Sequence, residues 1–204
     1  ANSLSIQTPY LSVERDVATD AYSLPNGTTR PNSDYGLTNL RAGYAKAFGA
    51  FDARFSAGIT DIHQGTPGGD DFLSPTSRQN NVSRDVNATL AATVRATTTM
   101  LQLGASSLDL VFACNTGYDS GGNPIDPNCY APPQLVTDSQ VNASLRTDTQ
   151  HDRSRTVYGI DLSRGTSRVD DGYDPLAIHP FARSAAYVQQ SWIVGSANSF
   201  YAGI

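Results

Sequence analysis

The chain has very little of three residues that favour helices. Glu14 is the only glutamate among 19 acidic residues, Lys46 is the only lysine among 14 basic residues, and Met100 is the only methionine. Glutamate, lysine and methionine favour helices, whereas the abundant threonine, serine, asparagine and valine do not. The composition therefore predicts a chain made mostly of strands and loops, with limited helix.

Long apolar runs and the usual catalytic motifs are missing as well. No apolar run approaches the roughly 20 residues of a membrane helix. The three histidines are scattered without zinc-ligand spacing. The glycine-rich stretch 65–71 lacks the lysine that follows a phosphate-binding loop, and no Gly-x-Ser-x-Gly elbow occurs. We therefore expect no enzyme, no cofactor and no catalytic metal.

The net charge of −5 on 204 residues argues against a protein that holds nucleic acid by bulk charge. It does not exclude a sheet face that carries arginine, because many of the aspartates fall in glycine- or proline-rich segments. The length fits one domain with a sizeable core. The first residues, 1–3, fit either removal of an initiator methionine or the start of a mature secreted chain.

The most informative segment runs from Val82 to Thr97 and alternates between apolar and polar residues. One parity holds valine, leucine and alanine with Arg84 as its single charged member, and the other parity is polar apart from Ala91. Alternation of this kind predicts a half-buried strand, and its length predicts a broad sheet with one continuous polar face.

The whole chain reads as one domain of class α+β, mainly β with a C-terminal helix. We expect an N-terminal hairpin over 1–30 and a sheet of six to eight antiparallel strands over 36–163, with long loops at 63–81 and 114–135. A helical segment over 175–204 is predicted from an apolar stripe at helical spacing. The stripe consists of Phe181, Ala185, Val188 and Trp192. Because one small helix cannot hide so much apolar surface, the chain is expected to dimerise.

Cys114 and Cys129 are the only cysteines, and they flank a loop rich in glycine, asparagine, aspartate and proline. They predict a disulfide, but the sequence leaves open whether it closes this loop or joins two subunits. Asp119, Asn123 and Asp126 offer oxygen ligands, so the loop is a candidate Ca²⁺ site, although the spacing differs from that of the helix–loop–helix calcium motif.

The polar face of the predicted sheet is a candidate RNA-binding surface. By parity within each strand it carries side chains suited to phosphate and base contacts. These are Arg41, Arg54, Asn87, Thr89, Thr93, Arg95, Ser144 and Arg146. A sheet face that meets only solvent would have a similar composition, so this alternative stays open.

The layout resembles the coat proteins of single-stranded RNA bacteriophages, the levivirus-like coats. Four features carry the resemblance. The start 1–3 looks like methionine removal, and long alternating strands precede one helical segment. The chain ends with Ser-Ala-Asn-Ser-Phe-Tyr at 196–201, and the two cysteines lie in a loop between strands.

The resemblance implies a homodimer whose helices cover one sheet face, while the other face lines a capsid and binds genomic RNA. The protein would then be a self-assembling structural subunit of the virion, made in the host cytoplasm. Its partners would be itself and single-stranded RNA, without a membrane, and its cysteines would cross-link subunits. The chain departs from the family in its greater length, its large loops, a further strand pair before the helix and its negative charge.

Two other classes fit parts of the sequence. An exported, cell-surface β-rich module or pilus subunit would explain the cysteines, the Asn-x-Ser/Thr sequences and the polar surface. A small outer-membrane β-barrel would explain the long alternating strands, with apolar residues facing lipid. Against the barrel, the segment 82–96 has no aromatic girdle, its apolar set is rich in alanine, and the C-terminal stripe has helical spacing.

Overall fold

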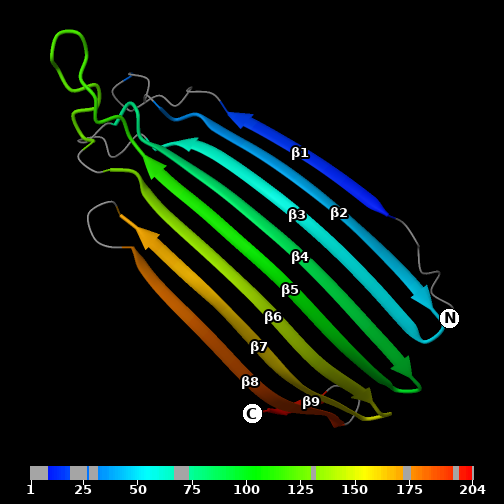
Figure 1. Cartoon of the computed structure of the whole chain (residues 1–204). Coiled ribbons are helices and arrows are strands. Elements are labelled where there is room, and N and C mark those ends of the chain that lie inside the picture. Colours follow the sequence, from blue (N-terminus) through cyan, green and yellow to red (C-terminus); the bar gives the residue numbers. More distant parts are fainter. Residues whose placement is uncertain are drawn as a thin grey trace.

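The computed structural model describes residues 9–18, 27, 32–66, 74–129, 132–171, 176–194 and 198–203. Within them, nine antiparallel strands form one open sheet, and each strand pairs with the next along the chain (Figure 1). The strands are β1 (Tyr10–Ala18), β2 (Tyr35–Phe48), β3 (Phe51–Gly65), β4 (Arg78–Val94), β5 (Thr97–Ala113), β6 (Gln134–Gln150), β7 (Ser154–Asp170), β8 (Ala177–Val194) and β9 (Asn198–Gly203).

The strand connections differ at the two ends of the sheet. At one end, β2 turns into β3 through Gly49 and Ala50, and β4 turns into β5 through Arg95 and Ala96. Gly49 has φ 62° and Arg95 has φ 55°, a left-handed conformation that suits glycine and makes an arginine unusual. At the opposite end the connections are longer, spanning 19–34, 66–77, 114–133 and 171–176.

The register sorts the strand residues onto two faces of different character, because paired residues point to the same side of a sheet. Large hydrophobic side chains gather on one side, which we name the apolar face. Towards the turn end of β2 to β8 they are Leu40, Tyr44, Phe48, Phe51, Phe55, Ile59, Val86, Leu90, Val94, Leu101, Leu103, Val141, Leu145, Tyr158, Ile160, Leu162, Val188 and Trp192, and at the loop end Leu135 and Ile178 lie on the same side. The alternate residues form the polar face.

No second layer covers either face within the described residues. Cys129 and Val157 are the only buried hydrophobic residues there, and the large side chains of the apolar face are between 38% and 64% exposed. A sheet normally buries one face against another layer to make a core. Among the residues that the structure describes, nothing packs on the apolar face.

The prediction of a C-terminal helix over 175–204 is wrong. Residues of this segment form β8, whose pairing with β7 runs from Ser154 opposite Trp192 to Val169 opposite Ala177. The predicted stripe is divided between the faces, because Phe181 and Ala185 have odd numbers and Val188 and Trp192 have even ones. The described chain holds no helix, so none reaches the length and apolarity needed to span a membrane.

The prediction of six to eight strands is also wrong, because the described chain contains nine. The C-terminal segment supplies the additional strands β8 and β9. The expected N-terminal hairpin over 1–30 lies partly outside the described residues; within it, β1 pairs with β2 along Tyr10–Ala18. The expected loops at 63–81 and 114–135 are shorter at 66–77 and 114–133, since β3, β4 and β6 extend further than the alternation indicated.

Candidate functional site

The apolar face forms a band of defined height next to the short turns. On β3 the apolar residues run from Phe51 to Ile59, and on β4 from Val86 to Val94, which is nine residues in each case. Strands that cross a bilayer need about 9–11 residues when tilted by about 45°. On these two strands the band therefore has the height of a hydrocarbon layer, whereas on β7 the apolar residues span only Tyr158 to Leu162.

The border of this band crosses the sheet obliquely. Leu40 at the border on β2 is in register, across five strand pairs, with Thr166 on β7. The apolar residues of β7 end at Leu162, four residues before Thr166. With about 3.3 Å per residue and about 4.8 Å per strand, the border makes an angle of about 30° with the register rows. Strands in closed barrels tilt by about 35–45°, so the loop-side border lies close to level in such a barrel. On the turn side Phe48 and Tyr158 share one register row, so the band narrows from β2 to β7.

Aromatic side chains concentrate at the turn side of the band. Phe48 and Phe51 flank the β2–β3 turn, and their ring centroids are 5.7 Å apart in a stacked arrangement. Tyr158 and Trp192 lie towards the same end on β7 and β8. The objection that the segment 82–96 lacks an aromatic girdle holds for β4 and extends to β5 and β6, because the aromatic residues at this end lie on β2, β3, β7 and β8.

Charged residues take over on the same side of the sheet at the loop end of the band. On β4, Arg84 follows Val86 in the alternation and donates a hydrogen bond to Asp109 of β5 at 2.7 Å. This bond lowers the pKa of the Asp109 carboxyl. On β7, Arg164 follows Leu162 in the same way. One side of the sheet thus has an apolar band with a polar border.

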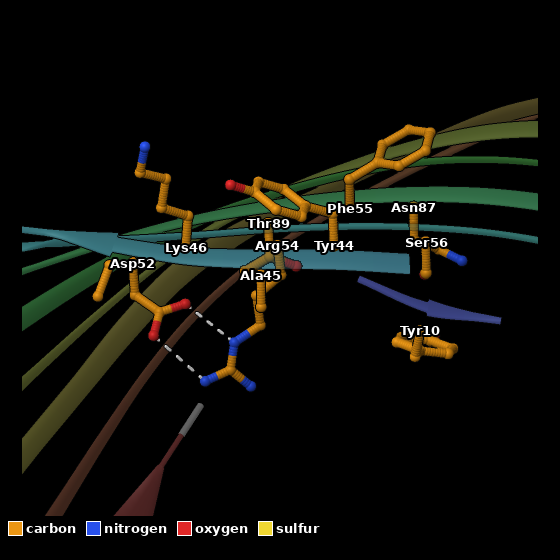
Figure 2. A pocket seen from close by; sticks show the side chains of 11 residues that line it. Tyr10, Tyr44, Ala45, Lys46, Asp52, Arg54, Phe55, Ser56, Asn87 and Thr89 are labelled. Carbon is orange, nitrogen blue, oxygen red and sulfur yellow. Dashed lines mark hydrogen bonds and ion pairs between the residues drawn. The ribbon is translucent and has the colours of Figure 1, made fainter. Parts of the chain in front are cut away.

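The polar face carries arginines that are matched by carboxylates. Figure 2 shows Arg54 and Asp52 on one side of the ribbon, with Lys46, Tyr44 and Phe55 on the other. Arg54 Nε donates to Asp52 Oδ1 at 2.9 Å, which raises the pKa of the arginine. Arg54 and Asp52 help to line a cavity of about 480 Å³ on the polar face, whereas Lys46 places a charge within the apolar band.

A second charged cluster lies at the turn end of β6 and β7. Asp148 accepts hydrogen bonds from Arg155 and lies 3.6 Å from Arg146. The hydrogen bond from Arg155, followed by the positive charges of both arginines, lowers the pKa of Asp148. Together these residues border a cavity of about 390 Å³ that also meets Thr98 and Met100.

The structure gathers most of the predicted RNA-binding residues on the polar face. Arg41, Arg54, Asn87, Thr89, Thr93, Ser144 and Arg146 all lie there. Arg95 does not, because it forms the β4–β5 turn. Each of the three arginines has a carboxylate within 4.0 Å on the same face, so this surface offers little uncompensated positive charge to a phosphate backbone. The RNA-binding role of these residues stays a prediction.

The loop end is tied together by hydrogen bonds around Asp126. This residue is only 2% exposed and accepts hydrogen bonds from Ser74 and from the Thr76 hydroxyl, the latter at 2.8 Å. Burial acts to raise the pKa of Asp126, but these hydrogen bonds outweigh it and the pKa lies below its ordinary value. Cys114 and Cys129 form a disulfide within the chain that closes the same loop. The loop at 114–129 is thereby fastened to residues 74–77.

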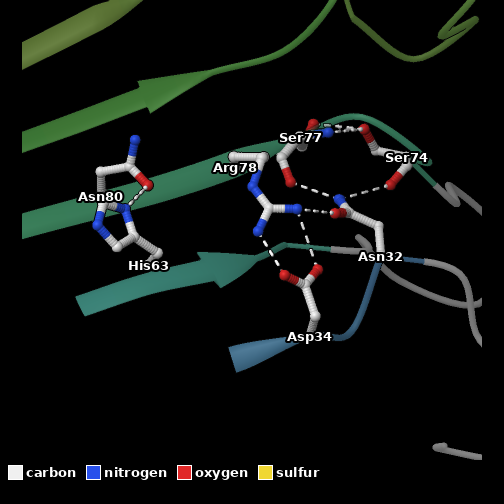
Figure 3. A network of polar contacts seen from close by, with 7 residues as sticks. All are labelled: Asn32, Asp34, His63, Ser74, Ser77, Arg78 and Asn80. Atoms are coloured by element: carbon white, nitrogen blue, oxygen red, sulfur yellow. Dashed lines mark hydrogen bonds and ion pairs between the residues drawn. The ribbon is translucent and has the colours of Figure 1, made fainter. Parts of the chain in front are cut away.

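A neighbouring network joins the start of β4 to the segment before β2. Arg78 donates to both carboxylate oxygens of Asp34, and Asn32 donates to the Ser74 and Ser77 carbonyls (Figure 3). The hydrogen bond from Arg78 lowers the pKa of Asp34. Sequence reasoning missed this network, because its residues come from separate loops and form no local motif.

The candidate calcium ligands point to different partners. Asp119 accepts hydrogen bonds from the backbone of Gly121 and Asn123, whereas Asp126 holds Ser74 and Thr76. In the described part of the chain, no group of three or more histidine, cysteine, aspartate or glutamate side chains could hold a metal ion.

No family model, curated protein or solved structure matches this chain.

Proposed function

We propose that this chain forms the wall of a transmembrane β-barrel, with the apolar face against lipid and the polar face lining the interior. The observation that carries the proposal is the apolar band, which spans nine residues on β3 and β4 and has no covering layer in the described chain. This proposal replaces the expectation of a protein without a membrane partner, because the apolar face needs an apolar partner.

The free energy of the apolar face supports this proposal over a water-soluble monomer. Fully burying a large hydrophobic side chain contributes roughly 1.5–3 kcal/mol. The eighteen side chains towards the turn end of this face are about half exposed, so covering them contributes roughly 20 kcal/mol. A sheet of this kind therefore requires cover.

The two ends of the sheet support the same proposal. Barrels of outer-membrane type have short turns on one side and longer loops on the other, with alternation between lipid-facing and lumen-facing residues. Here the short turns adjoin the aromatic residues, and the long connections carry the disulfide and the Asp126 contacts. Since unpaired edges do not occur in the hydrocarbon region, the proposal requires the sheet to close.

The coat-protein hypothesis stays a prediction, and in it protein rather than lipid would cover the apolar face. In the coat family, helices from a dimer lie on the sheet. The described residues supply no such helix, so another layer would have to come from elsewhere. Both hypotheses predict a folded sheet, but only the barrel predicts folding into vesicles as a single chain.

The test is refolding from urea into phosphatidylcholine vesicles, compared with dilution into buffer alone. The barrel proposal predicts strand-rich circular dichroism only with vesicles, faster migration of the unheated sample on a detergent gel, and protection of the strands from protease. Electron microscopy of the buffer sample provides the second arm. Closed particles containing RNA, with no insertion into vesicles, would overturn the proposal in favour of a coat protein.

A further inference from the structure

A shallow groove of about 600 Å³ crosses the apolar face over β5 to β8. On this face it is lined by Leu103, Val141, Ala143, Leu162, Ala182 and Ser184, with Arg164 at the polar border. Small side chains create the hollow: Ala143 is in register between Leu103 and Leu162, and Ala182 is opposite Arg164. The groove therefore runs from the apolar band to a positive charge.

Arg164 differs from the arginine in the matching position on β4. Each comes next after an apolar residue of the band in the alternation, Leu162 on β7 and Val86 on β4. Arg84 is neutralised by Asp109 at 2.7 Å. Arg164 is exposed, its neighbours in register are Val141 and Ala182, and it makes no ion pair within the described residues. Its charge stands above an apolar groove without a carboxylate.

We propose that this groove binds one diacyl phospholipid with an anionic headgroup. One of its acyl chains lies in the groove, and its phosphate contacts Arg164. The inference rests on the proposed function. A guanidinium forms paired hydrogen bonds with the phosphate of either lipid. The charge of Arg164 favours the anionic lipid of equal chain length, because the positive choline group of a zwitterionic headgroup offsets the attraction. An acyl chain suits the groove because Leu103, Val141 and Leu162 continue the apolar band along it.

The test is native mass spectrometry of the protein refolded in detergent micelles and titrated with dioleoyl phosphatidylglycerol or dioleoyl phosphatidylcholine. The wild type should bind one phosphatidylglycerol at least about fivefold more tightly than phosphatidylcholine, since one basic residue near an anionic lipid surface contributes about that factor. Arg164→Gln should remove this preference. Arg84→Gln is the matched control and should keep it, because Asp109 already neutralises Arg84.

Ala182→Phe tests the groove itself, because it fills the hollow and leaves Arg164 in place. This variant should lose the bound lipid of both kinds. Equal binding of the two lipids by the wild type, or an unchanged preference in Arg164→Gln, would overturn the lipid site while leaving the barrel intact. A chain that does not fold in micelles or vesicles would overturn the proposed function and the lipid site with it.

Discussion

Leu90 lies at the centre of the apolar band on β4. Replacing it with arginine distinguishes a face in contact with lipid from a face in contact with water, because the cost in stability differs between the two. An arginine at the midplane of a membrane barrel costs about 2–4 kcal/mol, falling to about 0–1 kcal/mol near the interface. On a surface exposed to water the same change stays within about 0.5 kcal/mol. Leu90 is 42% exposed and flanked in register by Ala53 and Leu101, so no buried polar partner offsets the charge.

The assay is urea unfolding in vesicles for three variants of β4. Leu90→Arg should lower the free energy of unfolding by about 2–4 kcal/mol, and Val94→Arg, at the turn border, by about 1 kcal/mol or less. Ala91→Arg is the control for the opposite side: it has the same depth but lies on the polar face beside Asp52. Equal losses for Leu90→Arg and Val94→Arg would refute the assignment of this face to lipid.

The remaining predictions concern the loops and the polar face. The pKa of Asp126 in the folded protein is below the ordinary value of 3.8, so the stability that Asp126 adds is complete above about pH 4 and is lost as the pH falls through that lowered pKa. Protease cleavage within 114–129 should therefore rise only at acid pH. Asp126→Asn should show the same cleavage at pH 7. If the Cys114–Cys129 bond closes one chain, non-reducing gels should show monomers, whereas ladders of linked chains would support the coat-protein cross-link. Gly165→Ala should destabilise the sheet by more than 1 kcal/mol, because its Cβ would come within 2.4 Å of the Ser139 carbonyl. Gly104→Ala should cost well below that value, because its Cβ meets the movable Asn142 side chain. Thermal unfolding in micelles measures both variants, and equal losses of stability would contradict the packing described here.

The strands were predictable where the alternation is strong. The segment from Val82 to Thr97 alternates across most of its length, and β4 covers Arg78–Val94. The polar face was predictable for the same reason, since parity alone places Arg54 and Thr89 on one side. The position of Arg95 was not, because alternation continues through a two-residue turn and does not mark it.

The C-terminal strand was missed because its sequence fits two periods. Phe181, Ala185, Val188 and Trp192 have helical spacing, but Ala182, Ala186, Val188 and Trp192 also share one strand parity. Small residues such as alanine and serine favour neither pattern strongly, so the neighbouring strand decides. The edge of β7 carries unpaired backbone groups over its whole length, and pairing with β8 satisfies them. Local sequence patterns do not predict such a pairing between neighbouring strands.

The most direct test of the membrane wall compares two neighbouring residues on opposite faces. In a Trp192→Phe background, Leu90→Trp and Ala91→Trp each place one tryptophan at the same depth of β4, on the apolar and polar face respectively. In vesicles whose acyl chains carry bromine, the barrel predicts strong quenching of the tryptophan at position 90 and weak quenching at position 91. Equal quenching at both positions, or none at position 90, would contradict it.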